Sequence, residues 1–153
     1  MNATLKDNIP SDTKDYLTIM IAEQRFGIPV LQVQDVLRQQ RMTRIPLASP
    51  EIAGSLNLRG RIVTAIDVRK RLNIPDRGDK ESSMSVVVEH EDELYSLIID
   101  RVGEVISLDD KNFDQNPGTL EPSWRDISMG IYQLKDNLMV VMDVKKLLSS
   151  IGE

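Results

Sequence analysis

Short apolar stretches rich in β-branched residues recur along the chain, separated by polar turns. They cover 16–22, 25–30, 61–66, 85–89, 94–100, 128–134 and 138–143. Runs of this length and composition predict strands, and the short polar gaps between neighbouring runs predict hairpins. The stretch 31–37 fits either a short helix or a bent strand. Many short strands with few long helices predict a mainly β fold, either barrels or a sandwich.

One stretch between these strands carries the start signals of a helix. Ser49 can cap it, Pro50 suits its first turn, and Glu51 places an acid near its positive end. We therefore predict a helix of two turns over 52–57.

Two parts of the chain repeat almost the same sequence. Without gaps, 54–72 aligns with 130–148, and 26–37 aligns more weakly with 95–106. Asp67 and Asp143 hold equivalent positions, each after an apolar strand and before a short basic segment. We predict that each aspartate caps a short helix, over 68–72 and 144–148. One β-rich unit is used twice, and each copy needs the other to bury its apolar faces, which indicates a scaffold.

The organisation of the chain follows from this repeat. Residues 1–15 are polar and are expected to form a flexible N-terminal tail. Residues 16–153 are expected to form one domain, in which two subdomains share a core and meet at a loop near 75–83. Five strands in each half, closed or nearly closed, would hide the strand edges. The stretch 109–123 is predicted to be an extended loop, and with the lone Trp124 it would give the second half its own surface.

The composition excludes several kinds of chemistry. The chain has no cysteine, so disulfides, thiolate metal sites and cysteine nucleophiles are excluded. Its only histidine, His90, sits in an acidic hairpin tip and cannot by itself supply a histidine-based metal site. No phosphate loop, dinucleotide fingerprint or nucleophile elbow is present. Asp67 and Asp143 could form an acid–base pair, but their matching context favours capping, so we predict no catalytic residues, no cofactor and no metal.

The charge balance argues against polyanionic partners. The formal net charge is -5, and the basic residues of the first half alternate with apolar rather than aromatic residues. A nucleic-acid binder usually carries a basic face, so we expect no nucleic-acid binding. No apolar run approaches the ~20 residues of a membrane helix, and the N-terminus lacks the pattern of a signal peptide. We expect a cytoplasmic protein that does not insert into membranes.

A turn in the first repeat differs from its counterpart in the second. Asn57-Leu58-Arg59-Gly60 should form a tight turn in which Gly60 supplies the free backbone. Arg59 would then stand at the tip beside Leu58, where its guanidinium can reach a carboxylate or carbonyl of a partner. The second copy keeps a cation, Lys135, but lacks the glycine, so the role of Arg59 belongs to the first half.

Five motifs in a definite order connect these features to a known family. They are FGIPVLQVQDV at 26–36, TRIP at 43–46, GSLNLRGRIVTAIDVR at 54–69, VGEV at 102–105 and MVVMDV at 139–144. Together they make the chain resemble the CheW-like domain family of chemotaxis coupling proteins, from about residue 16 to residue 148. The resemblance implies two intertwined five-stranded SH3-like β-barrels around a common core, with a few short helices and no catalytic activity.

The resemblance also implies partners and a location. Members of the family tether the chemotaxis histidine kinase CheA, through its regulatory domain, to the cytoplasmic tips of methyl-accepting chemotaxis receptors. The expected function is that of a non-enzymatic chemotaxis adaptor, which is cytoplasmic and recruited to receptor arrays at the inner face of the membrane.

The family's receptor-contacting groove can be carried over residue by residue. It matches Val33, Asp35, Gly54 and Arg59, and more loosely Val36, Asn57 and Leu58. In a groove that holds a helical hairpin, Val33 and Val36 would form the apolar floor. Asp35 and Arg59 would set the orientation of the partner. Core packing explains the two valines equally well, Gly54 is also explained by a close backbone approach, and the kinase-facing residues are not assigned.

Other interpretations stay open at this point. The chain could be a free-standing copy of the kinase's regulatory domain, or an adaptor of a non-motility chemosensory pathway. From a different class, it could be a small β-barrel enzyme that uses carboxylates. The enzyme predicts a deep polar pocket with carboxylates of shifted pKa, whereas the adaptor predicts a shallow apolar groove flanked by Arg59.

Overall fold

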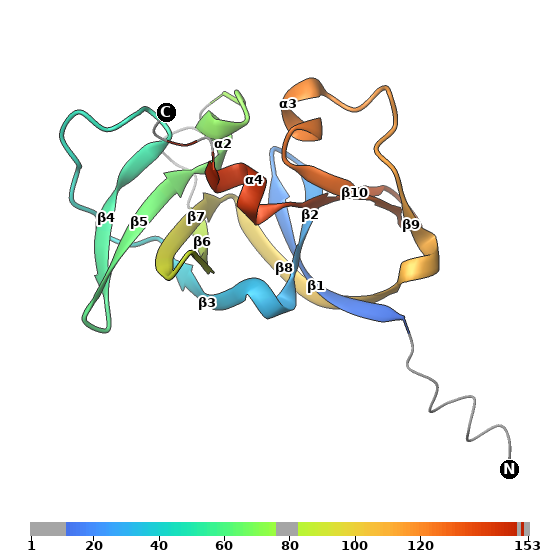
Figure 1. The fold of residues 1–153 in the computed structure, drawn as a ribbon, viewed down its shortest axis with the longest axis horizontal. Helices are drawn as coiled ribbons and strands as arrows, with labels where there is room; N and C mark the ends of the chain where they lie inside the picture. Colours follow the sequence, from blue (N-terminus) through green and yellow to red (C-terminus); the bar gives the residue numbers. More distant parts are fainter. Residues whose placement is uncertain (1–11, 76–82, 150, 152–153) are drawn as a thin grey trace, which may run out of the picture.

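The computed structural model describes residues 12–75, 83–149 and 151. Two curled sheets lie side by side along the long axis of the molecule (Figure 1). The first barrel has five strands, in spatial order β3 (Val33–Arg38), β6 (Met84–His90), β7 (Glu93–Ile99), β5 (Arg61–Asp67) and β4 (Ile52–Leu58). The second barrel has six, in the order β8 (Arg101–Asp109), β1 (Thr13–Ile21), β2 (Gln24–Pro29), β11 (Leu138–Met142), β10 (Ser128–Gln133) and β9 (Phe113–Asp114).

Short helices connect these strands. They are η1 (Val30–Gln32), α2 (Val68–Arg71), η2 (Asp110–Asn112), α3 (Pro122–Arg125) and α4 (Val144–Ser149). Figure 1 shows α2 and α4 between the barrels and α3 over the second barrel. The mainly β fold of two interlocked barrels with a few short helices is confirmed, with the two-residue β9 as a sixth strand that was not predicted.

The two halves of the chain exchange strands. Hairpin β1–β2 of the N-terminal half pairs with β8 and β11 of the C-terminal half. Hairpin β6–β7 of the C-terminal half pairs in the same way with β3 and β5. The contacts of β2 with β11 and of β5 with β7 are parallel, and they complete each barrel with strands from the other half. Because each barrel is completed by strands from the other half, neither repeat can form its barrel alone.

Two boundaries along the chain are set by these strands. β1 begins at Thr13, so Thr13 to Asp15 belong to a strand and not to the expected tail, while residues 1–11 lie outside the described residues. The loop near 75–83 divides the two repeats in sequence but not the two barrels. It joins α2 to β6 within the first barrel, and its residues 76–82 lie outside the described residues. The chain passes between the barrels at η1 and at Asp100 instead.

The helix predicted over 52–57 is wrong, because these residues form β4. The expected helix start is only a turn, in which the backbone N–H of Ile52 donates to the carbonyl of Ser49 at 2.9 Å. Gly54 and Leu56, two residues apart, are buried, and β4 pairs with β5 along its whole length. Alternation and a hairpin partner therefore outweigh local helix signals.

Two other stretches contain more regular structure than expected. The stretch 31–37, which fitted helix or strand, consists of the end of η1 followed by β3. The predicted loop 109–123 contains η2, β9 and the start of α3. Trp124 packs edge-to-face against Phe26, with ring centroids 5.5 Å apart, so it belongs to the core and does not form a separate outer surface.

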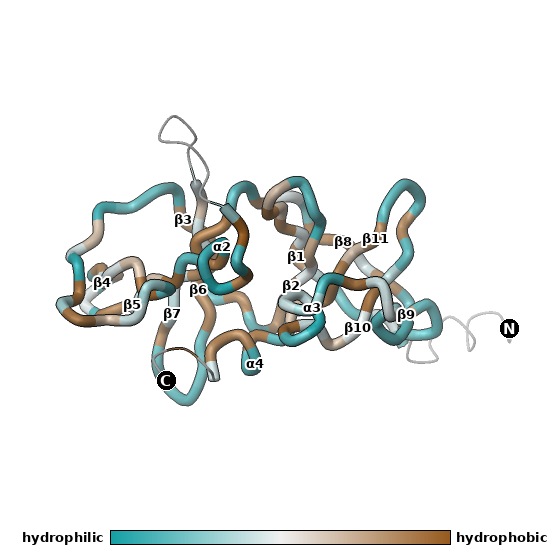
Figure 2. The backbone as a smooth tube through the Cα atoms, turned by 90° about the horizontal axis from the view of Figure 1, so that it is seen from above, coloured by the Kyte–Doolittle hydropathy of each residue, from teal (hydrophilic) through white to brown (hydrophobic). Residues whose placement is uncertain are grey.

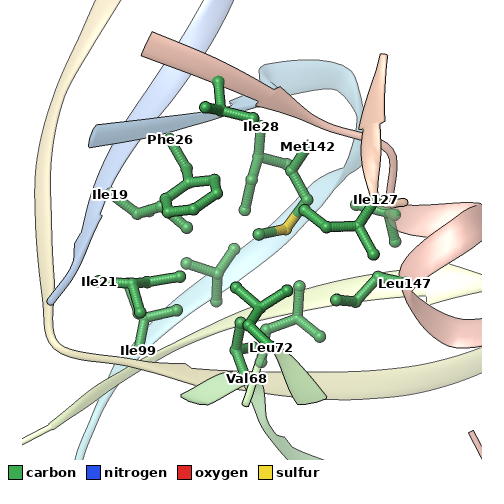
Figure 3. Close-up of a cluster of buried hydrophobic side chains, with 14 of the residues drawn as sticks. Ile19, Ile21, Phe26, Ile28, Val68, Leu72, Ile99, Ile127, Met142 and Leu147 are labelled. Carbon is green, nitrogen blue, oxygen red and sulfur yellow. The ribbon is translucent and has the colours of Figure 1, made fainter. Parts of the chain in front are cut away.

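Apolar side chains form one core shared by the barrels and a smaller core inside each. Successive residues of a strand point to opposite faces, so Val86 and Val88 enter the shared core while Val87 faces the interior of the first barrel. In the second barrel Val140 enters the shared core and Val141 faces the interior. Figure 3 shows the shared core with side chains from β1, β2, β7, α2, β11 and α4, and Figure 2 shows hydrophilic stretches concentrated on the loops. Each fully buried aliphatic side chain stabilises the fold by about 1.5–3 kcal/mol.

Candidate functional site

The turn that carries Arg59 closes the β4–β5 hairpin. Arg59 and Gly60 are its central residues, with φ of 51° and 88°. Positive φ at both positions is typical of tight hairpin turns whose twist matches that of the strands. A side chain at Gly60 would meet nothing within 4 Å, so the glycine is needed for its backbone conformation alone. The side-chain oxygen of Asn57 accepts a hydrogen bond from the N–H of Gly60 at 2.9 Å, and the predicted tight turn is confirmed.

Arg59 forms an ion pair with Asp35. Its Nη2 lies 3.0 Å from Asp35 Oδ2, while Asp35 Oδ1 accepts a hydrogen bond from the N–H of Val36 at 2.8 Å. β3 and β4 are the two edge strands of the five-stranded sheet, so the ion pair joins its edges. The Arg59 side chain is 77% exposed and that of Asp35 only 24%. Asp35 therefore orients a guanidinium that still has donors facing solvent.

The two valines of the predicted site have different surroundings. Val33 is half-buried and packs against the shared core. Val36 is exposed. The register of β3 against β6 shifts between Val33 and Asp35, and a bulge of this kind re-aims the side chains that follow it. Core packing therefore accounts for Val33, whereas Val36 is available at the surface beside the ion pair.

Gly54 is buried beneath a neighbouring segment. A Cβ at this position would lie 2.6 Å from the carbonyl oxygen of Thr43. Thr43 and Ser55 exchange two backbone hydrogen bonds of 2.8 Å there, which hold the segment against β4. The close backbone approach is thus confirmed, and a place for Gly54 in receptor contact stays a prediction.

The remaining predicted residues lie at the end of the same hairpin. Leu58 is half-buried and packs against the interior of the first barrel, and Asn57 is exposed and holds the turn. Ile62, directly across from Asn57, is 75% exposed, although it lies in one of the apolar stretches that we predicted as strands. Its position opposite a polar turn residue is the sequence signal that could have marked it as a surface residue. The structure therefore brings Asp35, Arg59 and the hairpin end together.

The acidic residues considered for catalysis are helix caps. Asp67 Oδ1 accepts a hydrogen bond from the N–H of Lys70 at 3.3 Å, and Asp143 Oδ1 accepts one from the N–H of Lys146 at 3.1 Å. The prediction of two equivalent caps is confirmed. Within residues 12–75, 83–149 and 151, no cluster of histidine and carboxylate side chains could hold a metal ion. The helices in this part of the chain are also too short or too polar to span a membrane.

A second apolar surface lies on the second barrel and was not predicted. A cavity of about 390 Å³ opens there, with a lining that includes Tyr16, Leu31, Phe113, Met129, Tyr132 and Val141. Leu31 is 94% exposed, and Phe113 and Met129 are exposed beside it. Large exposed apolar side chains around a cavity are typical of an interaction surface. These residues come from segments that are far apart in the sequence, so no local pattern marks them.

Two tyrosines have raised pKa values. Burial, followed by the hydrogen bond with Tyr16, raises the pKa of Tyr132 well above its usual range, and the two hydroxyls lie 3.4 Å apart. Burial, followed by the hydrogen bond to Glu93, also raises the pKa of Tyr95. Both tyrosines therefore stay neutral at physiological pH, as structural groups do.

Several known proteins are similar to this chain over most of its length. The family model described as the CheW-like domain matches residues 15–152. The chain is 27% identical to the chemotaxis protein CheW of Bacillus subtilis (strain 168) over 135 residues, which is 86% of this chain and 85% of that protein. It is 24% identical to the chemotaxis protein CheW of Helicobacter pylori over 147 residues, 96% of this chain and 88% of that protein. The crystal structure of the scaffolding protein TtCheW from Thermoanaerobacter tengcongensis matches with a TM-score of 0.81 at 29% identity, over 92% of this chain and 95% of that one.

Proposed function

Because the chain belongs to the CheW-like domain family, whose members are scaffolds and not enzymes, we propose that it couples methyl-accepting chemotaxis receptors to the histidine kinase CheA. Its role as a chemotaxis scaffold follows from the family. The proposal adds the two partners. It also adds the recruitment of a cytoplasmic protein to receptor arrays at the inner face of the membrane.

The ion pair of Arg59 and Asp35 carries the receptor part of this proposal. A receptor tip is a helical hairpin, and a helix docks on an apolar strip that has a few polar anchors. Val36 directly follows Asp35 in β3, Ile62 pairs with Asn57 beside the turn that carries Arg59, and both are exposed apolar residues. Arg59, oriented by Asp35, supplies the anchor, which gives specificity and orientation.

The second apolar surface supports a separate site for the kinase. A coupling protein must hold both partners at once, so it needs two surfaces that do not overlap. Leu31 and Phe113 lie on the second barrel, whereas Arg59 lies at the hairpin end of the first. We assign the receptor to the Arg59 surface and the regulatory domain of the kinase to the surface around Leu31.

Affinity capture with a receptor signalling fragment and with the kinase, each alone and then together, tests this assignment. Arg59→Ala should weaken receptor capture by about tenfold or more, as for a central interface arginine. It should leave kinase capture and the free energy of unfolding almost unchanged, within about 0.5 kcal/mol for the latter. Lys135→Ala, at the aligned turn of the second repeat, is the matched control and should leave receptor capture intact.

A reciprocal variant separates the two surfaces. Leu31→Asp should lose the kinase and keep the receptor, since an exposed side chain can be changed without loss of the fold. If Arg59→Ala unfolds the protein, Arg59 is structural and the receptor assignment fails. If the unchanged protein captures the kinase alone, the interpretation as a copy of the kinase's regulatory domain is favoured. Capture of receptors from a pathway unrelated to swimming would indicate the non-motility adaptor.

A further inference from the structure

Polar contacts between the two barrels gather around α2. The shared core joins the barrels by apolar burial, which is strong but has no preferred direction. Hydrogen bonds do have direction. Arg71 Nε donates to the carbonyl of Leu147 in α4 at 3.2 Å, and Ser123 Oγ in α3 donates to the carbonyl of Leu72 at 3.0 Å. The strongest of these contacts, however, is made by Arg69.

Arg69 and Asp100 form a two-pronged ion pair. Arg69 Nε donates to Asp100 Oδ1 at 2.9 Å, and Nη2 donates to Oδ2 at 2.5 Å. Parallel hydrogen bonds of this kind are shorter and stronger than neutral ones, and they restrict the relative orientation of the two side chains. The two side chains are only 11% and 17% exposed, so solvent screens them little.

The position of Asp100 makes this ion pair a junction between the barrels. Asp100 is the single residue between β7 of the first barrel and β8 of the second. Its Oδ2 also accepts a hydrogen bond from the N–H of Ala22 at 2.8 Å, in the turn of hairpin β1–β2. Arg69 Nη1 donates to the carbonyl of Pro75 at 2.6 Å and so extends the contact to the end of the α2 segment. One carboxylate thus links α2, the crossing point and a turn of the second barrel.

The other crossing point lacks such a junction. In the alignment of the two repeats, Lys145 corresponds to Arg69, and Leu31 corresponds to Asp100. Leu31 has no charge to offer, is 94% exposed and lies in the three-residue η1. Lys145 and Leu31 therefore cannot form the counterpart of the Arg69–Asp100 ion pair. The two repeats differ at the point where the chain passes from one barrel to the other.

We propose that Arg69 and Asp100 are positioning residues that set the angle between the two barrels. This proposal deepens the proposed function and rests on it, because the angle matters when the Arg59 surface and the Leu31 surface hold two partners at once. The shared core keeps the barrels together, and the junction at Asp100 selects one relative orientation. Neither residue needs to touch a partner.

Distance measurements between spin labels test the angle without any partner. The chain has no cysteine, so cysteines introduced at the exposed positions Arg61 of the first barrel and Gln133 of the second label specifically. The unchanged junction should give one narrow distance distribution. Asp100→Asn and Arg69→Lys should broaden it, because the amide removes the charge and lysine cannot make the fork. Lys145→Gln, at the equivalent helix position, is the control and should leave the distribution narrow.

Partner binding provides the second readout. Both variants should bind the receptor fragment alone, and the kinase alone, as tightly as the unchanged protein does. The affinity for the second partner, measured with the first already bound, should fall by about fivefold or more, which is the lower end of the usual coupling between two binding sites. An unchanged distance distribution in both folded variants would overturn the proposal. A broadened distribution, in a protein that never binds the two partners, would support the junction and reject the proposed function. Equal weakening of single and joint binding would show a merely structural role and overturn the positioning role.

Discussion

The β4–β5 and β10–β11 hairpins show what the two repeats share. Both carry a bulge just before the aligned glycine, Gly54 in one and Gly130 in the other. In both, a neighbouring segment lies so close that a Cβ would be 2.6 Å from a backbone oxygen, that of Thr43 or that of Asp114. In both, an aspartate at the end of the second strand caps a helix: Asp67 is the last residue of β5, and Asp143 directly follows β11. The sequence therefore repeats where the backbone of the barrel requires it.

The turns of the same hairpins show where the repeats differ. Arg59 forms an ion pair with Asp35. Lys135 and Glu104 hold the aligned positions, and although both belong to the described part of the chain, no ion pair joins them. The second turn is also longer and is closed by a hydrogen bond from Leu134 N to the carbonyl of Asn137. The second barrel closes without a charged pair at this position, so the difference is consistent with the proposed role of Arg59 in binding a partner.

The shared part of the comparison can be broken at the glycines, where we expect the largest effect. Gly54→Ala places a methyl group against the backbone carbonyl of Thr43. Gly130→Ala places one against the backbone carbonyl of Asp114. Each should lower the free energy of unfolding by about 1–3 kcal/mol, as overpacking does. Urea unfolding followed by circular dichroism measures this change.

Gly118→Ala is the matched control for these variants. A Cβ there would meet nothing within 4 Å, so the midpoint should hardly move. If either of the two bulge glycines tolerates alanine equally well, the close approach is not what the repeat preserves.

The repeated glycine also gives evidence against the helix that we predicted over 52–57. Gly54 aligns with Gly130, which lies in a stretch that we correctly predicted as a strand, so the repeat alone argued for a strand over 52–57. The helix signals at Ser49 and Pro50 are local and weak, each a fraction of the free energy of a barrel hairpin. Consistency between the two copies was the stronger evidence.

The caps are the second shared feature, and we expect a smaller effect there. Asp67→Ala and Asp143→Ala each remove an acceptor for an N–H at the start of α2 or α4, which should lower the free energy of unfolding by about 0.5–2 kcal/mol. Replacement by serine or asparagine should recover most of the loss, since both side chains can cap. Thermal unfolding of the alanine and serine variants measures it. Normal melting together with lost partner capture would contradict the capping role.

The sequence predicted the local parts of the site and missed those that depend on distant contacts. The turn at Arg59 and the two caps follow from residue types at short spacing. The family resemblance placed Asp35 and Arg59 in one groove, but no spacing rule predicts their ion pair, because it joins the two edges of a sheet that strands from the other half complete. The cavity at Leu31 was missed for the same reason. Strand exchange places side by side residues that no spacing rule connects.

The charged pairs themselves allow the smallest and sharpest test. A double-mutant cycle with Asp35→Asn and Arg59→Gln should give a coupling free energy of about 0.2–1 kcal/mol, since Arg59 is largely exposed. The aligned cycle with Glu104→Gln and Lys135→Gln should give about zero, and added salt should reduce only the first value. Equal coupling in both cycles would remove the difference between the repeats. With so small a coupling in the first cycle, a tenfold loss of receptor capture in Arg59→Ala cannot come from stability and must come from the partner's contact with the guanidinium.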